Sequence, residues 1–120
     1  MKISTNLQRK QRHSRLRKRI FGTSEQPRLF VHRSGKHLYA QAIDDYQGKT
    51  LFSFSTLDKE FKKELPKGST VQAAKKLGEI AGPKFLAKKV KKIVFDRGGD
   101  KYHGRVKAFA EALRQTGVTF

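Results

Sequence analysis

The first 22 residues constrain the fold most, because they carry charge of a single sign and few side chains that could form a core. They contain eight basic residues and no acidic one. Such a segment cannot bury enough apolar surface to fold by itself. We predict an arginine-rich arm, disordered in isolation and partly helical once phosphates cancel its repulsion, with Leu16 and Ile20 on one face. Its basic residues are Lys2, Arg9, Lys10, Arg12, Arg15, Arg17, Lys18 and Arg19.

Two other interpretations of this arm stay open. It could be a solvated tail without a specific role, or an organellar transit peptide, since transit peptides are also rich in arginine and poor in acids. The chain has no apolar run near the roughly 20 residues that a membrane span needs, and its N-terminus lacks the apolar segment of a secretory signal. We therefore expect a soluble protein that is retained inside the cell.

The charge of the whole chain points to an anionic partner. The 28 Lys and Arg residues outnumber the 10 Asp and Glu residues, for a net charge of +18. Residues 23–120 still hold 20 of these basic residues and all 10 acids, so the body contributes as well as the arm. A compact molecule with this surplus repels itself. Nucleic-acid phosphate is the favoured partner, because it offers closely spaced charge and releases counterions on binding.

A chain of 120 residues is long enough for one domain with an extension. We assign residues 1–22 to the basic arm and residues 23–120 to a single domain. Strand patterns over 28–33 and 37–43 flank a glycine turn, which predicts a β-hairpin. A second turn at 44–48 leads into a strand at 49–55, so the sheet begins as a three-stranded antiparallel meander.

Two helices and a further strand should follow the meander. A helix begins near Val71, capped by Ser69 or Thr70, and we expect Gly82 and Pro83 to break or kink it. Residues 91–96 form a short apolar strand that should join the same sheet in a buried position, through a crossover. The last helix presents an apolar face and ends at Gly117. That face is formed by Val106, Phe109, Ala110 and Leu113.

The connection at 96–105 is the most informative segment for function. Its glycines, Gly98 and Gly99, let a ligand approach the backbone, and the following helix N-terminus offers free amides. The charges of Arg97, Lys101 and Arg105 suit an RNA backbone, and Tyr102 or His103 could stack on a base or ribose. The structural alternative is an ordinary strand-to-helix turn in which Asp96 or Asp100 caps the helix and Tyr102 completes the core, and for the aspartates we favour this alternative.

The hairpin offers a second basic and aromatic surface, formed by Arg33, Lys36, His37 and Tyr39. Tyr39 could instead point inward.

We predict no metal and no cofactor. The four histidines show no ligand spacing, the chain has no cysteine, and no phosphate-loop or dinucleotide fingerprint is present. A magnesium-dependent nuclease would need acids that converge in one cleft. A general nucleic-acid binder would bind DNA and RNA alike. The acids available are Asp44, Asp45, Asp96, Asp100 and Glu111, of which Asp44 and Asp45 more simply form a turn.

Several sequence blocks resemble the family of bacterial-type large-subunit ribosomal protein eighteen. Residues 37–45, 48–51 and 55–57 carry the first part of this resemblance, and residues 95–99, 101–108 and 110–112 carry its more specific part. The similarity extends over about 27–120, and the basic arm agrees with the family in layout. The chain departs from the family where Gly82 and Pro83 interrupt the first body helix, and at Lys89, where the family often has glycine.

The resemblance implies a three-layer α/β domain built on a mixed sheet, preceded by the basic arm. It implies a non-catalytic constituent of the large ribosomal subunit that binds 5S rRNA, attaches it to the large-subunit rRNA in the central protuberance, and contacts neighbouring ribosomal proteins. The ribosome would be cytoplasmic or, alternatively, organellar. The candidate rRNA-binding residues are Arg9, Lys10, Arg12, Arg15, Arg17, Lys18, Arg19, Arg28, Arg33, Lys36, His37, Tyr39, Arg97, Lys101, Tyr102, His103 and Arg105.

Overall fold

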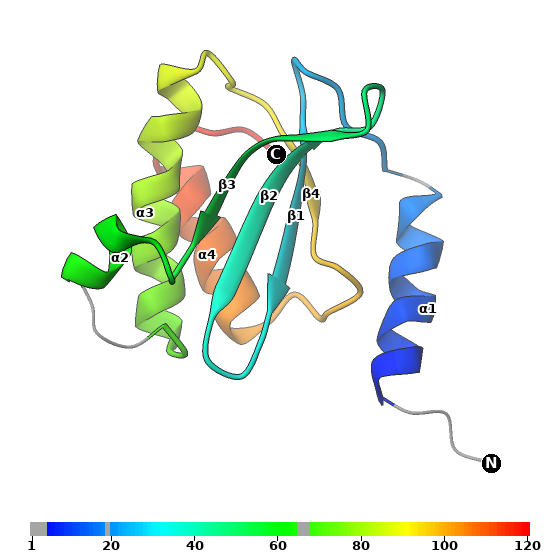
Figure 1. The fold of residues 1–120 in the computed structure, drawn as a ribbon, viewed down its shortest axis with the longest axis horizontal. Coiled ribbons are helices and arrows are strands. Elements are labelled where there is room, and N and C mark those ends of the chain that lie inside the picture. The colour runs from blue at the N-terminus through cyan, green and yellow to red at the C-terminus, as the bar shows by residue number, and fades with distance from the viewer. Residues whose placement is uncertain (1–4, 19, 65–67) are drawn as a thin grey trace.

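A mixed sheet with helices on both sides organises the computed structural model of the chain, which describes residues 5–18, 20–64 and 68–120 (Figure 1). Arg19, and the expected shared face of Leu16 and Ile20, lie outside this description. None of the helices in the described part is long and apolar enough to cross a membrane. The elements are α1 (Thr5–Arg17), β1 (Arg28–Arg33), β2 (Leu38–Asp44), β3 (Lys49–Ser55), α2 (Lys59–Glu64), α3 (Val71–Ala87), β4 (Val94–Asp96) and α4 (Gly104–Gln115).

The sheet has the strand order β3-β2-β1-β4. Strands β1, β2 and β3 pair antiparallel, which confirms the predicted meander, and β4 joins β1 in parallel. The prediction for the last strand was too long and too buried. Lys92 lies outside β4 in an isolated bridge to Thr119, while Val94 and Phe95 are only half-buried, because β4 is the short edge strand of the sheet.

The core lies between the sheet and helices α2, α3 and α4, which cover one of its faces (Figure 1). Burial alternates along β2, where Leu38, Ala40 and Ala42 face these helices and the residues between them face the other way. The predicted apolar face of α4 is confirmed, since all four of its residues are at most 1% exposed. Thr70 caps α3, its side chain accepting a hydrogen bond from the Ala73 amide at 3.0 Å.

Helix α3 runs through Gly82 and Pro83 without interruption, so the predicted break is wrong. Proline removes the hydrogen bond to the carbonyl of Glu79, four residues earlier. Both Pro83 and Glu79 lie on the exposed side of the helix, where water can satisfy that carbonyl. On the opposite side, a Cβ at Gly82 would meet Thr116 Oγ1 at 1.9 Å. The close packing of α3 against the end of α4 thus needs glycine and stabilises the helix at this point.

The short helix α2 lies in a polar stretch for which the sequence predicted no helix. Phe61 is its anchor, 1% exposed and part of the core. A helix of six residues with one buried aromatic shows too little hydrophobic periodicity to be predicted from the sequence. The packing of Phe61 against the core therefore determines that α2 forms.

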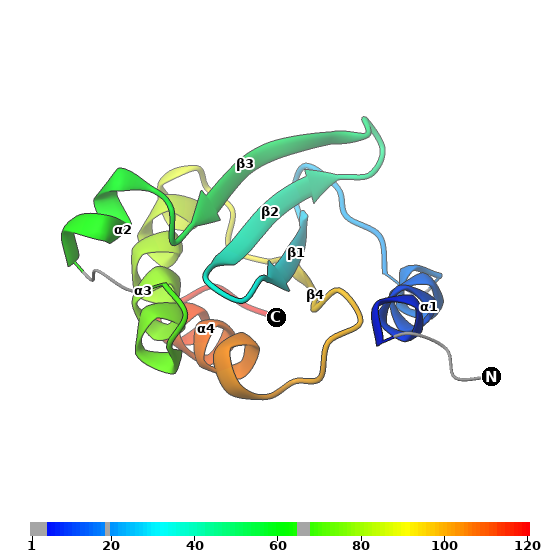
Figure 2. The same cartoon turned by 60° about the horizontal axis from the view of Figure 1, so that its bottom comes forward.

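Helix α1 stands on the other side of the sheet from α3 and α4, which completes the three layers of the α/β fold (Figure 2). The contact runs through side chains: the His13 ring stacks on Phe30 of β1, with centroids 5.0 Å apart and planes 18° apart. The arm is helical over Thr5–Arg17, and one face of this helix meets the body. The expected dependence of this helix on phosphates stays a prediction.

Candidate nucleic-acid interface

The loop that follows β4 is the place where the arm meets the body. Asp96, fully buried at the end of β4, accepts hydrogen bonds from the Gly98 amide at 2.9 Å and from Arg28 Nη1 at 2.7 Å. His13 Nε2 hydrogen-bonds the same carboxylate at 2.8 Å. Gly99 has φ +81°, and a Cβ there would lie 2.4 Å from the carbonyl oxygen of Arg9. Glycine is therefore required here because the backbone of α1 approaches it, whereas the sequence interpretation assigned that space to a ligand.

The expected capping role of the two loop aspartates is wrong. His103 occupies the N-cap position of α4, and its side chain makes no capping hydrogen bond. Asp96 instead joins Arg28 and His13, and Asp100 turns toward arginines. In this strongly basic chain, a buried carboxylate gains more from a guanidinium than from a helix amide, since hydrogen bonds with both partners ionised are the stronger ones.

Arg28 links the loop to the second turn of the meander. Its Nε and Nη2 donate to the two oxygens of Asp45 at 3.0 and 3.1 Å, alongside its bond to Asp96. Burial lowers the pKa of Arg28, but its hydrogen bonds to the two carboxylates outweigh this effect and raise it overall. The hydrogen bond from Arg28, with further help from the Gly22 amide and Arg17, lowers the pKa of Asp45. Arg17 Nη2 reaches Asp45 at 3.3 Å, which adds a second attachment of the arm.

A basic groove opens between α1, the end of the hairpin and the start of α4. Its cavity volume is about 300 Å³, and an adjoining hollow of about 200 Å³ shares Arg9, Arg33 and Asp100 with it. Burial, followed by the charge of Arg33, lowers the pKa of Arg105. We call this site the basic groove, lined by Arg9, Arg12, Arg33, Asp100, Lys101, His103, Gly104 and Arg105.

An aromatic row crosses the open face of the sheet beside the groove. Beyond His13, the ring of Phe30 stacks on His32 at 5.1 Å, and His32 stacks on Tyr39 at 4.9 Å. Tyr39 thus faces away from the core, which decides between the two orientations left open by the sequence. Burial, together with the charge of Arg9, lowers the pKa of His32. This lowering of its pKa favours the neutral form of the His32 imidazole.

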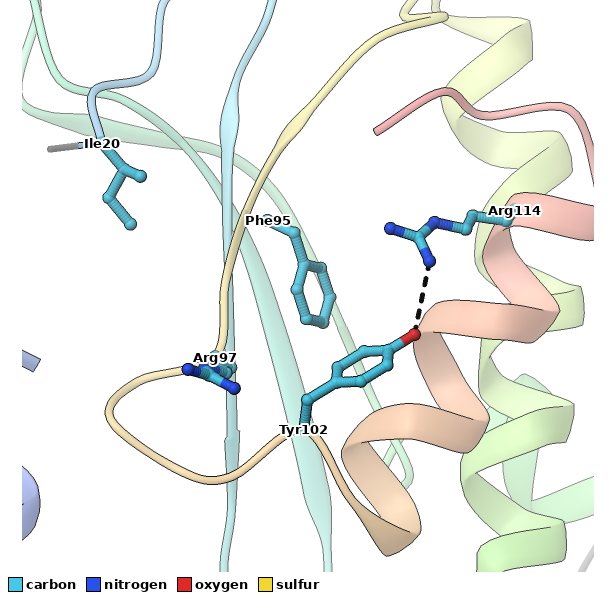
Figure 3. Close-up of a pocket in the computed structure, with 5 residues that line it drawn as sticks. All are labelled: Ile20, Phe95, Arg97, Tyr102 and Arg114. Carbon is cyan, nitrogen blue, oxygen red and sulfur yellow. Dashed lines mark hydrogen bonds between the residues drawn. The ribbon is translucent and has the colours of Figure 1, made fainter. Parts of the chain in front are cut away.

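A second, mostly apolar hollow lies on the other side of the loop, with a volume of about 290 Å³ (Figure 3). The rings of Phe95 and Tyr102 meet edge to face, and Arg114 Nη1 donates to the Tyr102 hydroxyl at 3.4 Å. Arg97 reaches the hollow from the loop, and Ile20 from the chain after α1. Tyr102 is 36% exposed, so it closes the rim of this hollow and does not complete the core as expected.

The structure brings some of the candidate residues together and separates others. Arg15 and Lys18 are exposed on or beside α1, and Lys36 is exposed in the hairpin turn. His37 hydrogen-bonds Thr56 at 2.9 Å, and Arg28 is 7% exposed between two carboxylates. The remaining described candidates line the basic groove or the two hollows, apart from Arg17 at Asp45 and Tyr39 in the aromatic row. Residues at these sites that sequence reasoning missed are His13, Phe30, His32 and Arg114.

The sequence contains a signal that could have identified two of these missed residues. Phe30 and His32 alternate with the buried Leu29 and Val31, so the period of two predicts them on the face opposite the core. His13 and Arg114 carried no such signal. Within the described ranges, no group of three acidic or histidine side chains is placed to hold a metal ion. Asp45 and Asp96, two of the acids considered for magnesium, share the guanidinium of Arg28 instead.

Comparison with known proteins identifies relatives of the chain. A family model described as ribosomal L18 of archaea, bacteria, mitochondria and chloroplast matches residues 3–120. A protein of Thermotoga petrophila named large ribosomal subunit protein uL18 is 56% identical over 119 residues, which cover 99% of this chain and 98% of the relative. Proteins of the same name from Caldanaerobacter subterraneus and Lachnospira eligens are each 52% identical, over 100% and 99% of this chain and 98% of each relative.

Proposed function

The chain belongs to the ribosomal L18 family, and from this premise we propose that it binds 5S rRNA and helps attach it to the large-subunit rRNA in the central protuberance. It is a structural constituent of the large ribosomal subunit and not an enzyme. The relatives are bacterial, and bacterial ribosomes lie in the cytoplasm. In the proposed division, residues 1–22 are the RNA-binding arm and residues 23–120 the rRNA-binding domain, with neighbouring ribosomal proteins as further partners.

One observation carries this proposal: basic side chains from three separate parts of the chain meet at one groove. Arg12 comes from α1, Arg33 from the end of β1, and Lys101 and Arg105 from the loop and α4. A folded domain can hold these charges in a fixed pattern, so that phosphates at matching positions are neutralised together. The release of their counterions drives binding, and the fixed pattern favours one RNA shape over others.

Other exposed candidate residues would extend the contact beyond this groove. Exposed Arg15 and Lys18 continue the basic surface along the arm, and Lys36 lies in the hairpin turn. Two exposed rings, His103 in the groove lining and Tyr102 at the rim of the apolar hollow, can stack on a base or a ribose. The chain thus acts as a scaffold whose affinity is the sum of many contacts.

The test measures binding of the full chain to 5S rRNA and to an unrelated structured RNA of equal length, across a salt series. We expect a preference for 5S rRNA that survives moderate salt. The variant Arg33→Ala/Lys101→Ala should bind 5S rRNA more weakly, and its slope of log K against log salt should be shallower by about 2, one for each lost phosphate contact.

The matched control is Lys59→Ala/Lys75→Ala, which removes the same charge from exposed positions on α2 and α3, helices that contribute no residue to the lining of the groove. This control should keep most of its affinity and its salt slope. Equal affinities for the two RNAs, falling together with salt, would reduce the chain to a nonspecific polycation. Equal losses in both variants would place the RNA elsewhere on the molecule.

A further inference from the structure

Asp100 presents an unusual feature at the basic groove: a buried carboxylate oxygen without a hydrogen-bond donor. The residue is 7% exposed, and its Oδ2 atom has no hydrogen-bond partner. The nearest cations are Arg33 Nε, at 3.7 Å from Oδ2, and Arg9 Nη1, at 3.9 Å from Oδ1. These distances permit charge attraction but are too long for hydrogen bonds. A buried acceptor without a donor is costly, and such atoms in folded proteins usually have a role.

One guanidinium at the groove, that of Arg105, has a donor without an acceptor. Arg105 Nη1 is also buried without a hydrogen-bond partner, while Nη2 of the same guanidinium donates to the Ser34 carbonyl at 2.9 Å. With Arg9 and Arg33, this makes three guanidinium groups around one carboxylate, so the groove keeps a positive surplus. It can therefore take an anion that supplies an acceptor for Nη1 of Arg105.

The N-terminus of α4 opens on the same groove, since Gly104 and Arg105 line it. His103 at the N-cap position makes no side-chain capping bond, and the first turn contains no acidic residue. The first amides of this helix therefore lack a side-chain partner, and the positive end of its dipole is not compensated. Amides in this state favour a phosphate.

We infer that the basic groove binds one ribose–phosphate unit of RNA, with the phosphate on Arg33, Arg105 and the N-terminus of α4, and the 2′-hydroxyl donating a hydrogen bond to Asp100 Oδ2. This inference rests on the proposed RNA-binding function and names the part of the nucleotide that is read. A carboxylate repels a phosphate oxygen but accepts a hydrogen bond from a hydroxyl group. The sugar of RNA supplies that hydroxyl beside the phosphate, and the sugar of DNA does not.

Arg33 controls access to the acceptor. Its guanidinium lies over Oδ2, and its side chain is 50% exposed at the end of β1. A half-exposed arginine can turn toward an incoming phosphate at little cost, because its charge stays solvated or paired throughout. The movement uncovers Oδ2 when the phosphate arrives, so the sugar contact forms together with the phosphate contact.

The experiment uses the full chain and pools of 5S rRNA in which 2′-deoxynucleotides or 2′-fluoronucleotides are incorporated at random positions. Bound and unbound RNAs are separated, and the substitutions that reduce binding are mapped. The wild-type protein should discriminate against 2′-deoxy substitution at a small set of positions. At one of them, 2′-fluoro should reduce binding as strongly, about tenfold, because fluorine cannot donate a hydrogen bond to a charged acceptor.

Asp100→Ala should lose the discrimination at that position and keep it at the others. The matched control is Glu79→Ala, which removes one negative charge from an exposed position of α3 and should leave the whole pattern unchanged. This control separates the loss of a specific acceptor from the general gain of affinity that any added positive charge brings.

Two results would overturn the assignment while leaving 5S rRNA binding intact. One is an identical pattern for Asp100→Ala and the wild-type protein. The other is that the wild-type protein tolerates 2′-fluoro at every position where 2′-deoxy reduces binding. This second result needs no variant, so it tests the assignment even if Asp100→Ala does not fold. A wild-type chain without preference for 5S rRNA over the unrelated RNA would overturn the proposed function, and this inference with it.

Discussion

The role of Arg28 is determined by the residues that surround it in the folded chain. It begins β1, which the sequence identified as a strand, and its charge made it a candidate for RNA contact. In the structure its guanidinium is buried between Asp45 and Asp96, and it connects the turn after β2 with the end of β4. Removing one partner from such a buried group leaves an uncompensated charge and is strongly destabilising. Arg28 therefore holds the surface on which the exposed basic residues are placed.

The ion pair between Arg28 and Asp45 predicts how stability depends on pH. Because Arg28 lowers the pKa of Asp45 in the folded chain, the stabilisation is complete above the ordinary carboxylate pKa and is lost as the pH falls through that value toward the native one. Asp45→Asn should lower the free energy of unfolding at neutral pH by about 2 kcal/mol. Its loss of stability between about pH 5 and pH 2 should also be shallower than in the wild-type chain.

Urea unfolding followed by circular dichroism over this pH range measures both effects. The control is Glu79→Gln, which removes an exposed carboxylate of α3. Parallel pH profiles for Asp45→Asn and the wild-type chain would show that the pair with Arg28 does not contribute to the acid dependence.

The backbone conformation of Lys89 leads to a second prediction about a single residue. It has φ +62° just after α3, the left-handed conformation that costs a residue with a side chain about 1–2 kcal/mol. The glycine that the resembled family often has at this position avoids that cost. Lys89→Gly should therefore raise the free energy of unfolding by about 1 kcal/mol, after allowance for the greater freedom of glycine in the unfolded chain. Lys88→Gly, at a neighbouring position with φ −90°, should not stabilise; equal effects of the two changes would contradict this explanation.

At the scale of elements, the crossing of α3 and α4 depends on the absence of a side chain at Gly82. The nearest atoms to a Cβ there belong to Thr116, at 1.9 to 2.6 Å. Gly82→Ala should lower the free energy of unfolding by about 2–3 kcal/mol, although alanine is the better helix former, because the helices must separate. Gly35→Ala is the control, since a Cβ there meets nothing within 4 Å.

Thermal unfolding measures these variants. Adding Thr116→Ala to Gly82→Ala should restore part of the stability, because the double variant removes Oγ1 and Cγ2 of Thr116, two of the three obstructing atoms. A Gly82→Ala chain as stable as the wild-type chain would show that the two helices can move apart without loss.

The arm contributes a prediction at the same scale. No member of the hydrophobic core comes from the described part of residues 1–20, so deletion of these residues should leave the body folded. The deletion removes the polar contacts that Arg9, Arg12, His13 and Arg17 make with the body. RNA affinity should fall and the salt dependence of binding should become flatter, because the eight basic residues of the arm no longer displace counterions. Binding to 5S rRNA across a salt series measures this. An unchanged slope would mean that the arm does not touch phosphate.

At the scale of the whole molecule, the net charge of +18 acts on every element at once. Without RNA, like charges on α1, the hairpin and the loop repel each other, and added salt screens this repulsion over about 10 Å at 0.1 M. The buried pairs of Arg28 are screened much less. The melting temperature of the RNA-free chain should therefore rise as sodium chloride increases from low to moderate concentration.

The chain without residues 1–20 serves as the comparison, because its surplus of positive charge is only ten. Its melting temperature should rise less steeply with salt. A melting temperature that falls with salt in the full chain would show that exposed ion pairs, and not self-repulsion, dominate the electrostatics of the free protein.

The sequence by itself determined the features that depend on local pattern. Alternation predicted the meander, helical spacing predicted the face of α4, the count of charges predicted an anionic partner, and the blocks around residues 37–57 and 95–112 identified the family. Short-range periodicity and composition are sufficient for these, because the physical cause acts within a few neighbouring residues. Even so, the meander's hairpin did not reveal which way Tyr39 points.

The tertiary structure alone decided the features that depend on contacts between distant segments. Helix α3 continues past Pro83 because Gly82 packs on Thr116, and α2 forms because Phe61 reaches the core. Asp100 pairs with Arg33 and Arg9, which lie 67 and 91 residues away along the chain, and the arm docks where Gly99 leaves space. Such partners are chosen by packing and by the low dielectric of buried sites, which a residue's own neighbours in sequence do not encode.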